Sequence, residues 1–264
     1  MNRIQKLFAR KRGVFVAYLT IGAPTLAGSV EAAKTLLANG ADILELGVPF
    51  SDPMADGATI REAAAIALKQ NVTLSDVLAA AREIRRDFPS APLVAFSYYN
   101  VIFKYGLEKF AEDAAAAGID ALLAVDVPLE ERDELLPVLR RKGLTLVPLA
   151  APTTSLERCV RLAEGLDDSF LYAVTVCGVT GARAELPPEL FKRLEEIKNV
   201  VSLPVCAGFG VSSGGQVESI CRVADGFVVG SALVKKSLQS DAVPTHFASL
   251  AAFAKSLVPG GRSV

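Results

Sequence analysis

The sequence predicts an α/β fold, a single (β/α)8 barrel spanning residues 1–264, from three observations. Eight short apolar runs alternate with Ala- and Leu-rich segments of helical period. The runs are apolar on both faces, which is typical of parallel strands covered by helices. A chain of 264 residues also suits eight such units, because α/β barrels of this length routinely form one domain.

Each repeating unit supplies one strand and at least one helix. The expected strands are residues 14–19, 42–46, 93–97, 121–125, 145–149, 170–174, 204–207 and 226–229. The expected helices are residues 30–39, 59–70 with 75–87, 107–117, 130–142, 155–164, 188–199 and 214–223, followed by 232–238 and 244–257. A short amphipathic helix is expected over residues 1–8. The pattern therefore predicts an extra N-terminal helix and extra helices after strands two and eight.

Glycines end several of these helices just before a strand. Gly40, Gly118 and Gly143 occupy the helix C-cap position, and the first two belong to a repeated Gly-x-Asp-x-Leu pattern. Such a repeat is expected of a fold built from one recurring unit. No Gly-x-Gly-x-x-Gly sequence follows the first strand, which lowers the alternative of an open dinucleotide-binding sheet.

Composition excludes several classes of function. A net charge of -1 and a pI near 6.0 provide no basic stripe for nucleic acid. No apolar run is long enough to cross a bilayer and the N-terminus does not resemble a secretory signal, so a cytoplasmic protein is expected. Cys159, Cys177, Cys206 and Cys221 lack any C-x-x-C spacing and are interpreted as buried small hydrophobes. With His246 as the only histidine, a metal site is not expected.

The segment from Leu44 to Gly57 is the strongest candidate for chemistry. Strand alternation puts Glu45 on the face opposite Leu44 and Leu46. Ionised carboxylates are seldom fully buried unless paired, and burial alone raises their pKa, so Glu45 is a candidate acid or base. A structural ion pair is the alternative interpretation. The loop that follows carries a second carboxylate, Asp56.

Residues at the carboxyl ends of the strands should converge on one mouth, where barrels of this type place their chemistry. Besides Glu45 and Asp56, they include Tyr98, Asp126, Tyr172, Thr180, Gly181, Phe209, Gly210, Gly230 and Ser231. The glycines after strands seven and eight, with Ser231 beginning a helix, suit phosphate binding by backbone N–H groups. Gly208 and Gly210 would otherwise only make a tight turn.

The chain resembles the tryptophan synthase α-subunit family over nearly its whole length. The motifs that carry the resemblance are Leu-Glu-Leu-Gly-Val-Pro-Phe-Ser-Asp-Pro at 44–53 with Ala-Asp-Gly at 55–57, Tyr-Tyr-Asn at 98–100, Ala-Pro-Thr-Thr at 151–154, Gly-Val-Thr-Gly-Ala-Arg at 178–183 and Gly-Phe-Gly-Val-Ser at 208–212. The resemblance implies a lyase that cleaves indole-3-glycerol phosphate to indole and glyceraldehyde 3-phosphate in tryptophan biosynthesis. It also implies no cofactor of its own and a pyridoxal-phosphate-dependent β subunit as partner, in an α2β2 complex.

The resemblance also assigns roles to the candidate residues. Glu45 matches the acid-base glutamate and Asp56 the second catalytic carboxylate. Thr180 and Gly181 match a loop that closes over substrate, and Tyr172 a tyrosine beside the indole, while Tyr98 is expected to contact substrate. Gly181, Phe209, Gly210, Gly230 and Ser231 match the phosphate contacts.

Some positions depart from the family pattern, but none of them is a catalytic or phosphate residue. They are Ala23, Ala58, Val101, Val125, Cys177 and the pair Gly214-Gly215. Several fall in loops that in the family move or face the partner, so regulation is less securely implied than chemistry.

Three alternatives remain open at this stage. One is a stand-alone lyase that releases indole. Another is a different phosphosugar reaction, such as the ring closure that makes indole-3-glycerol phosphate, which is expected to need a lysine at the mouth. The last is a non-catalytic barrel that activates a β partner, although the presence of both Glu45 and Asp56 argues against it.

Overall fold

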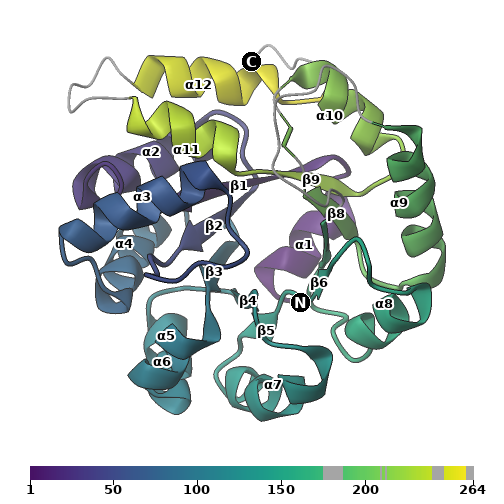
Figure 1. Ribbon diagram of the computed structural model, residues 1–264, viewed down its shortest axis with the longest axis horizontal. Helices are drawn as coiled ribbons and strands as arrows, with labels where there is room; N and C mark the ends of the chain where they lie inside the picture. Colours follow the sequence, from purple (N-terminus) through teal and green to yellow (C-terminus); the bar gives the residue numbers. More distant parts are fainter. Residues whose placement is uncertain (175–186, 209, 212, 240–246, 260–264) are drawn as a thin grey trace.

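A computed structural model describes residues 1–174, 187–208, 210–211, 213–239 and 247–259. Its helices surround a ring of parallel strands, as Figure 1 shows. The strands are β1 (Val14–Thr20), β2 (Ile43–Gly47), β3 (Leu93–Ser97), β4 (Ala121–Ala124), β5 (Thr145–Leu146), β6 (Leu149–Ala150), β7 (Leu171–Val174), β8 (Val205–Gly208) and β9 (Gly226–Val229).

The helices follow the strands in alternation. They are α1 (Arg3–Arg10), α2 (Leu26–Ala38), α3 (Ala58–Lys69), α4 (Leu74–Asp87), α5 (Tyr99–Tyr105), α6 (Leu107–Ala116), the 3-10 turn η1 (Leu129–Glu131), α7 (Arg132–Arg141), α8 (Leu156–Ala163), α9 (Pro188–Val200), α10 (Gly214–Cys221), α11 (Ser231–Leu238) and α12 (Phe247–Ser256). None of the helices within the described residues is long and apolar enough to cross a membrane.

The sheet closes through a strand that is broken in the middle. Its strand order is β5-β4-β3-β2-β1-β9-β8-β7-β6, with every pair parallel. Its two ends, β5 and β6, are separated only by Val147 and Pro148. The Val147 N–H donates to Leu122 on β4 at 2.9 Å, and the Pro148 carbonyl accepts from Tyr172 on β7 at 2.9 Å. The predicted eight-stranded (β/α)8 barrel, a TIM barrel, is therefore confirmed, with its fifth strand in two pieces.

Apolar side chains fill both the barrel and the layer between strands and helices. Inward-facing residues of the strands form one cluster, which includes Val16, Ile43, Val94, Leu123 and Val228. The helix α1 closes the bottom of the barrel by adding Ile4 and Leu7 to that cluster. A larger cluster joins the outward faces of the strands to the helices. The lower end of the barrel interior is therefore apolar and covered by α1.

Aspartates before three of the strands tie the bottom of the barrel together. Asp42 accepts the Phe15 N–H at 2.9 Å and Asp120 accepts the Leu93 N–H at 2.9 Å. Asp225 repeats this contact with the first residue of β8 at 3.0 Å. Each aspartate thus binds the backbone of the neighbouring strand and also pairs with a basic side chain. This explains the aspartate of the Gly-x-Asp-x-Leu repeat.

The predicted elements differ from the structure in a few places. The helix α5 was not predicted, and its first N–H, from Tyr99, donates to the Asp126 side chain at 2.7 Å. Asp126 caps this helix from a distant part of the chain, so no capping residue appears in the sequence just before the helix. The helix α2 begins at Leu26, before the predicted residue 30, because Thr25 caps it. The prediction of glycine helix ends is confirmed by the positive φ of Gly40, Gly118 and Gly143.

The cysteines follow the prediction only in part. Cys159 and Cys206 are buried as expected, whereas Cys221 is half-buried at the end of α10. Cys177 and His246 lie outside the described residues. Within the described part of the chain, no group of three or more His, Cys, Asp or Glu side chains could hold a metal ion.

Candidate active site

Glu45 is buried inside the upper barrel, where no described residue provides a counter-charge. It lies on β2, with Tyr18 of β1 and Val94 of β3 as its register neighbours. Its side chain is 1% exposed, and neither carboxylate oxygen has a hydrogen-bond partner among the described residues. Burial raises the pKa of Glu45 to about 8. The carboxyl is therefore protonated at neutral pH, and the alternative of a structural ion pair is not supported by the described residues.

Asp56 lies in the loop between β2 and α3 and is held there by Tyr98. The Tyr98 hydroxyl donates to Asp56 Oδ2 at 3.2 Å and accepts the Ala55 N–H at 2.9 Å. The Tyr98 ring in turn stacks on Phe50 with ring centres 4.9 Å apart. Burial raises the pKa of Asp56 to about 6, while the Tyr98 hydrogen bond and the Arg61 charge oppose that rise. At pH 7 Asp56 is therefore mostly ionised, unlike Glu45.

Two tyrosines line the same part of the mouth. Tyr172, on β7, was predicted from the sequence, whereas Tyr18, on β1, was missed. Burial raises the pKa of both phenols, and the charges of Glu45 and Asp56 raise them further. Both hydroxyls therefore stay protonated and can donate hydrogen bonds. The sequence did contain a signal for Tyr18. Side chains two residues apart in a strand share a face, so Tyr18 points inward like Val14 and Val16.

Two glycines make room for these tyrosines. A Cβ atom at Gly47 would lie 2.3 Å from the Tyr18 hydroxyl oxygen. A Cβ atom at Gly208 would lie 2.3 Å from a ring carbon of Tyr172. Both distances are far below contact, so glycine is required at each position for the tyrosine to take its place. Gly208 therefore has a packing role, whereas the sequence analysis considered only a tight turn or phosphate binding for it.

The predicted phosphate residues lie at the ends of β8 and β9. Gly230 is the N-cap of α11, Ser231 is the exposed first residue of that helix, and Gly210 is exposed after β8. In the described residues, no side chain caps α11 or the preceding helix α10. A Cβ atom at Gly230 would be 3.7 Å from Tyr18, so Tyr18 stands between this end and Glu45. Thr180, Gly181 and Phe209 lie outside the described residues.

The arrangement gathers groups with different chemical capacities around one opening. A protonated carboxyl, an ionised carboxyl and two phenolic hydroxyls come from β2, its following loop, β1 and β7. Backbone N–H groups that no described side chain caps follow β9, at the start of α11. Such a site can donate and remove protons at neutral pH while it holds an anion.

The chain is similar to known proteins of one family. A family model described as "Tryptophan synthase alpha chain" matches residues 4–257. The tryptophan synthase alpha chain of Aquifex aeolicus is 43% identical over 235 residues, which are 89% of each chain.

Solved structures agree in fold as well as in sequence. The tryptophan synthase subunit alpha of Legionella pneumophila superposes with a TM-score of 0.88 at 33% identity, over 98% of this chain and 97% of that one. A chain from the tryptophan synthase α2β2 complex of Pyrococcus furiosus gives a TM-score of 0.86 at 36% identity, over 94% and 98% of the two chains. Because the family model matches the chain from α1 through the end of α12, this chain belongs to the tryptophan synthase alpha chain family.

Proposed function

We propose that this chain is the lyase subunit of a cytoplasmic tryptophan synthase and acts as one barrel domain. It cleaves indole-3-glycerol phosphate to indole and glyceraldehyde 3-phosphate in tryptophan biosynthesis, without a cofactor of its own. The observation that carries the proposal is that one site contains two different carboxyl groups. Glu45 is buried and protonated, and Asp56, in the loop that follows β2, is ionised. Two carboxyl groups whose environments separate their pKa values can act as acid and anion in the same site.

The reaction needs three events at the indole ring and the glycerol chain. C3 of the indole takes up a proton, positive charge develops on the ring nitrogen, and a hydroxyl proton leaves as the C3–C3′ bond breaks. The bonding electron pair returns to the ring, which restores indole, and the released chain becomes an aldehyde. Glu45 donates the proton to C3 and, as a carboxylate, then accepts the hydroxyl proton, so that it ends the cycle protonated.

Asp56 and the tyrosines serve the ring itself. The ionised Asp56 carboxylate accepts the indole N–H and stabilises the positive charge that develops there. Tyr98 fixes the position of that carboxylate through its hydrogen bonds to the loop. Tyr18 and Tyr172 provide flat apolar walls beside Glu45, which keep water from it and suit an aromatic substrate.

The phosphate binds at the opposite side of the mouth. Gly210, Gly230 and Ser231 present backbone N–H groups at the starts of loops and helices, where an anion is favoured by the helix dipole. Phe209 and Gly181 complete this site in the proposal, and Thr180 belongs to the loop that closes over substrate. With phosphate here and Asp56 at the ring, the scissile bond lies over Glu45.

A pyridoxal-phosphate-dependent β subunit is the proposed partner and receives the indole, in an α2β2 complex. Exposed apolar side chains next to the mouth support this. Met54, in the Asp56 loop, is 93% exposed, and Phe103, on α5, is 69% exposed. A partner that receives the indole must cover the mouth, and it would bury both side chains.

The ring-closing alternative finds no support at the mouth. That reaction was expected to use a lysine as its acid, and none of the described strands contains a lysine. The remaining competitors are a lyase that works alone and a non-catalytic barrel that activates a β partner.

The test is an assay of purified protein with indole-3-glycerol phosphate, following indole release. Turnover is expected, and Asp56→Asn should reduce it by at least about a hundredfold, as the loss of a charge-stabilising group does. Glu62→Gln, an exposed carboxyl on α3, is the matched control and should leave it unchanged. No indole release from folded protein, with or without a β subunit, would refute the proposed function.

A further inference from the structure

The proposed reaction needs a hydrogen-bond donor for Glu45 that the resting site does not use. Once Glu45 has given its proton to the indole ring, it is a carboxylate on a side chain that is 1% exposed. No described residue donates to either of its oxygens in the structure. A buried carboxylate without a donor is costly, so a donor has to come within reach during the cycle.

Tyr18 is placed to supply that donor. It is the register neighbour of Glu45 on β1, and a Cβ atom at Gly47 would lie 2.3 Å from its hydroxyl oxygen. Glu45 and Gly47 share one face of β2, about 7 Å apart along the strand. A glutamate side chain and one hydrogen bond of about 2.7 Å can bridge that distance. The phenol therefore leans over the strand that carries Glu45, on the same inner face.

The Tyr18 hydroxyl is held by Thr20, and together they have a proton to spare. The two hydroxyl oxygens are 3.3 Å apart, and either can be the donor. Two hydroxyl protons share this one bond, and neither hydroxyl has another acceptor among the described residues. Thr20 can therefore donate to the Tyr18 oxygen and leave the Tyr18 proton for the Glu45 carboxylate.

The second buried tyrosine leans over a different strand. A Cβ atom at Gly208, on β8, would lie 2.7 Å from the Tyr172 hydroxyl oxygen. In the sheet, β1 and β9 separate β8 from β2. Tyr172 therefore directs its hydroxyl toward β8, whereas Tyr18 directs its hydroxyl toward β2.

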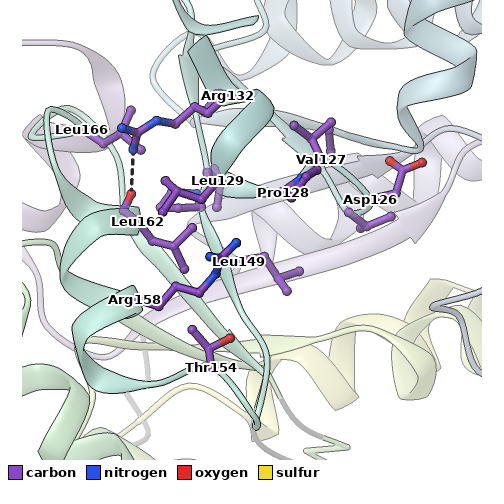
Figure 2. A pocket seen from close by; sticks show the side chains of 15 residues that line it. Asp126, Val127, Pro128, Leu129, Arg132, Leu149, Thr154, Arg158, Leu162 and Leu166 are labelled. Carbon is purple, nitrogen blue, oxygen red and sulfur yellow. Dashed lines mark hydrogen bonds between the residues drawn. The ribbon is translucent and has the colours of Figure 1, made fainter. Parts of the chain in front are cut away.

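Two arginines near the broken fifth strand do not serve Glu45 either. Figure 2 shows Arg132 and Arg158 in a cavity of about 260 Å³ between η1–α7 and α8, with a hydrogen bond from Arg132 to a carbonyl of α8. Glu130 binds Arg158 through two bonds of 2.7 Å. Neither Glu45 nor Tyr18 lines this cavity. Tyr18 is therefore the donor that the geometry favours.

We propose that Tyr18 is a positioning residue for Glu45, and that its hydroxyl, held by Thr20, donates a hydrogen bond to the Glu45 carboxylate formed during the reaction. Tyr18 keeps its own proton, because burial and the charges of Asp56 and Glu45 raise the pKa of the phenol. A donor to the carboxylate lets Glu45 give up its proton more readily. The bond is released when Glu45 takes the hydroxyl proton of the substrate. The proposal rests on the proposed lyase reaction, but the contact can be tested without substrate.

Few other groups can move the pKa of Glu45. Asp56, Tyr98, Tyr172 and Cys206 are the other titratable groups that interact electrostatically with Glu45 or with the two buried tyrosines at the mouth. Burial raises the pKa of Tyr98, Tyr172 and Cys206, so these three are neutral at pH 7. Of these groups, Asp56 alone carries a charge, and the variants below leave it in place.

The contact predicts the pKa of Glu45 in the protein without substrate. Tyr18→Phe keeps the ring against Phe96 but removes the donor, so the pKa of Glu45 should rise by about one unit. Infrared difference spectra of the carboxyl band against pH measure it, and Glu45→Gln identifies the band. Thr20→Val should shift the pKa less in the same direction, because Tyr18 loses the group that holds it. Tyr105→Phe is the control and should cause no shift.

The lyase assay tests the consequence for turnover. Tyr18→Phe should lower kcat at least about tenfold and change KM less than about twofold, because the bond forms only after Glu45 is ionised. The falling limb of kcat/KM against pH should move to higher pH. A shifted pKa in protein that releases no indole would support the contact and refute the lyase function instead. An unmoved pKa in both Tyr18→Phe and Thr20→Val, or a shift caused by Tyr172→Phe alone, would refute the proposal.

Discussion

At the scale of single residues, the two carboxyl groups predict how the reaction depends on pH. Asp56 must be ionised, and its pKa is about 6, whereas Glu45 must be protonated, and its pKa is about 8. The plot of kcat/KM against pH should therefore be bell-shaped, rising through pH 6 and falling through pH 8. Steady-state assays from pH 5 to pH 9.5 measure it. In Asp56→Asn the rise through pH 6 should disappear from the residual activity, and its persistence would assign that limb to another group.

Glu45 also predicts an effect on stability that is separate from catalysis. Its pKa is raised on folding, so between about pH 4.5 and pH 8 the folded state binds more protons than the unfolded state. Stability from this group is complete below pH 4.5 and is lost as the pH rises through 8.

Glu45→Gln should remove that loss while it abolishes turnover, because an amide cannot transfer the proton. Relative to wild type, the free energy of unfolding of Glu45→Gln should rise by on the order of 3 kcal/mol between pH 5 and pH 8. Urea denaturation at the two pH values measures this, with Glu62→Gln as the control. A variant with more than about a tenth of wild-type kcat, a barrier change below about 1.4 kcal/mol, would show that Glu45 is not the acid.

At the scale of elements, the Tyr98 hydroxyl, at the N-terminus of α5, makes two hydrogen bonds to the Asp56 loop. Tyr98→Phe keeps the ring on Phe50 but removes the bonds to Ala55 and Asp56. We expect kcat/KM to fall about tenfold, for a loss near 1.4 kcal/mol.

The Tyr98 hydrogen bond lowers the Asp56 pKa, so the acid limb of the pH profile should also move to higher pH in this variant. Tyr105→Phe, whose hydroxyl bonds Asp113 on α6, is the control. An acid limb that does not move would show that Tyr98 does not tune Asp56.

The sequence was informative about elements wherever the signal is local. Apolar runs and glycine helix ends located the eight strands of the barrel, because burial on two faces and a positive φ each restrict residue type. It failed at α5, whose cap comes from Asp126, and at the break after Leu146, where the fifth strand pairs with β4 and then with β7. Both features depend on contacts between segments far apart in the chain.

Part of the candidate site could also be predicted from the sequence. Glu45 was identifiable because a carboxylate in an apolar strand is unusual, and the family motifs supplied Asp56, Tyr98 and Tyr172. The control of Asp56 by Tyr98 could not be foreseen, since it requires the loop after β2 to fold over the end of β3. The need for glycine at positions 47 and 208, where tyrosines of neighbouring strands leave no room for a Cβ atom, could not be predicted for the same reason.

At the scale of the whole molecule, the exposed apolar groups beside the mouth predict control by a partner. Titrating a cognate β subunit into the lyase assay should raise the rate at least about tenfold, as contact orders the Asp56 loop. Ala58 and Val101, where the family usually has proline, leave more backbone entropy to be lost on ordering, up to about 1 kcal/mol each. A rate that is high without the β subunit and does not change would indicate a stand-alone lyase.

Variants at the surface locate this contact. Met54→Glu and Phe103→Glu should weaken the stimulation, since a buried charge opposes association. Val200→Glu, at the end of α9, changes an exposed apolar residue on another part of the molecule and should have no effect. Equal stimulation of all three variants would place the partner surface elsewhere.

The broken fifth strand makes the barrel unequal around its circumference. Two residue pairs join β4 to β5 and two join β6 to β7, whereas five join β1 to β2. Fewer hydrogen bonds must break to part the wall there, so brief local openings should cost less free energy at this seam than opposite it. Amide hydrogen exchange followed by NMR should show Val147 and Ala150 exchanging faster than Leu44 and Leu46. The ring of strands would then open first at its fifth strand, between β4 and β7.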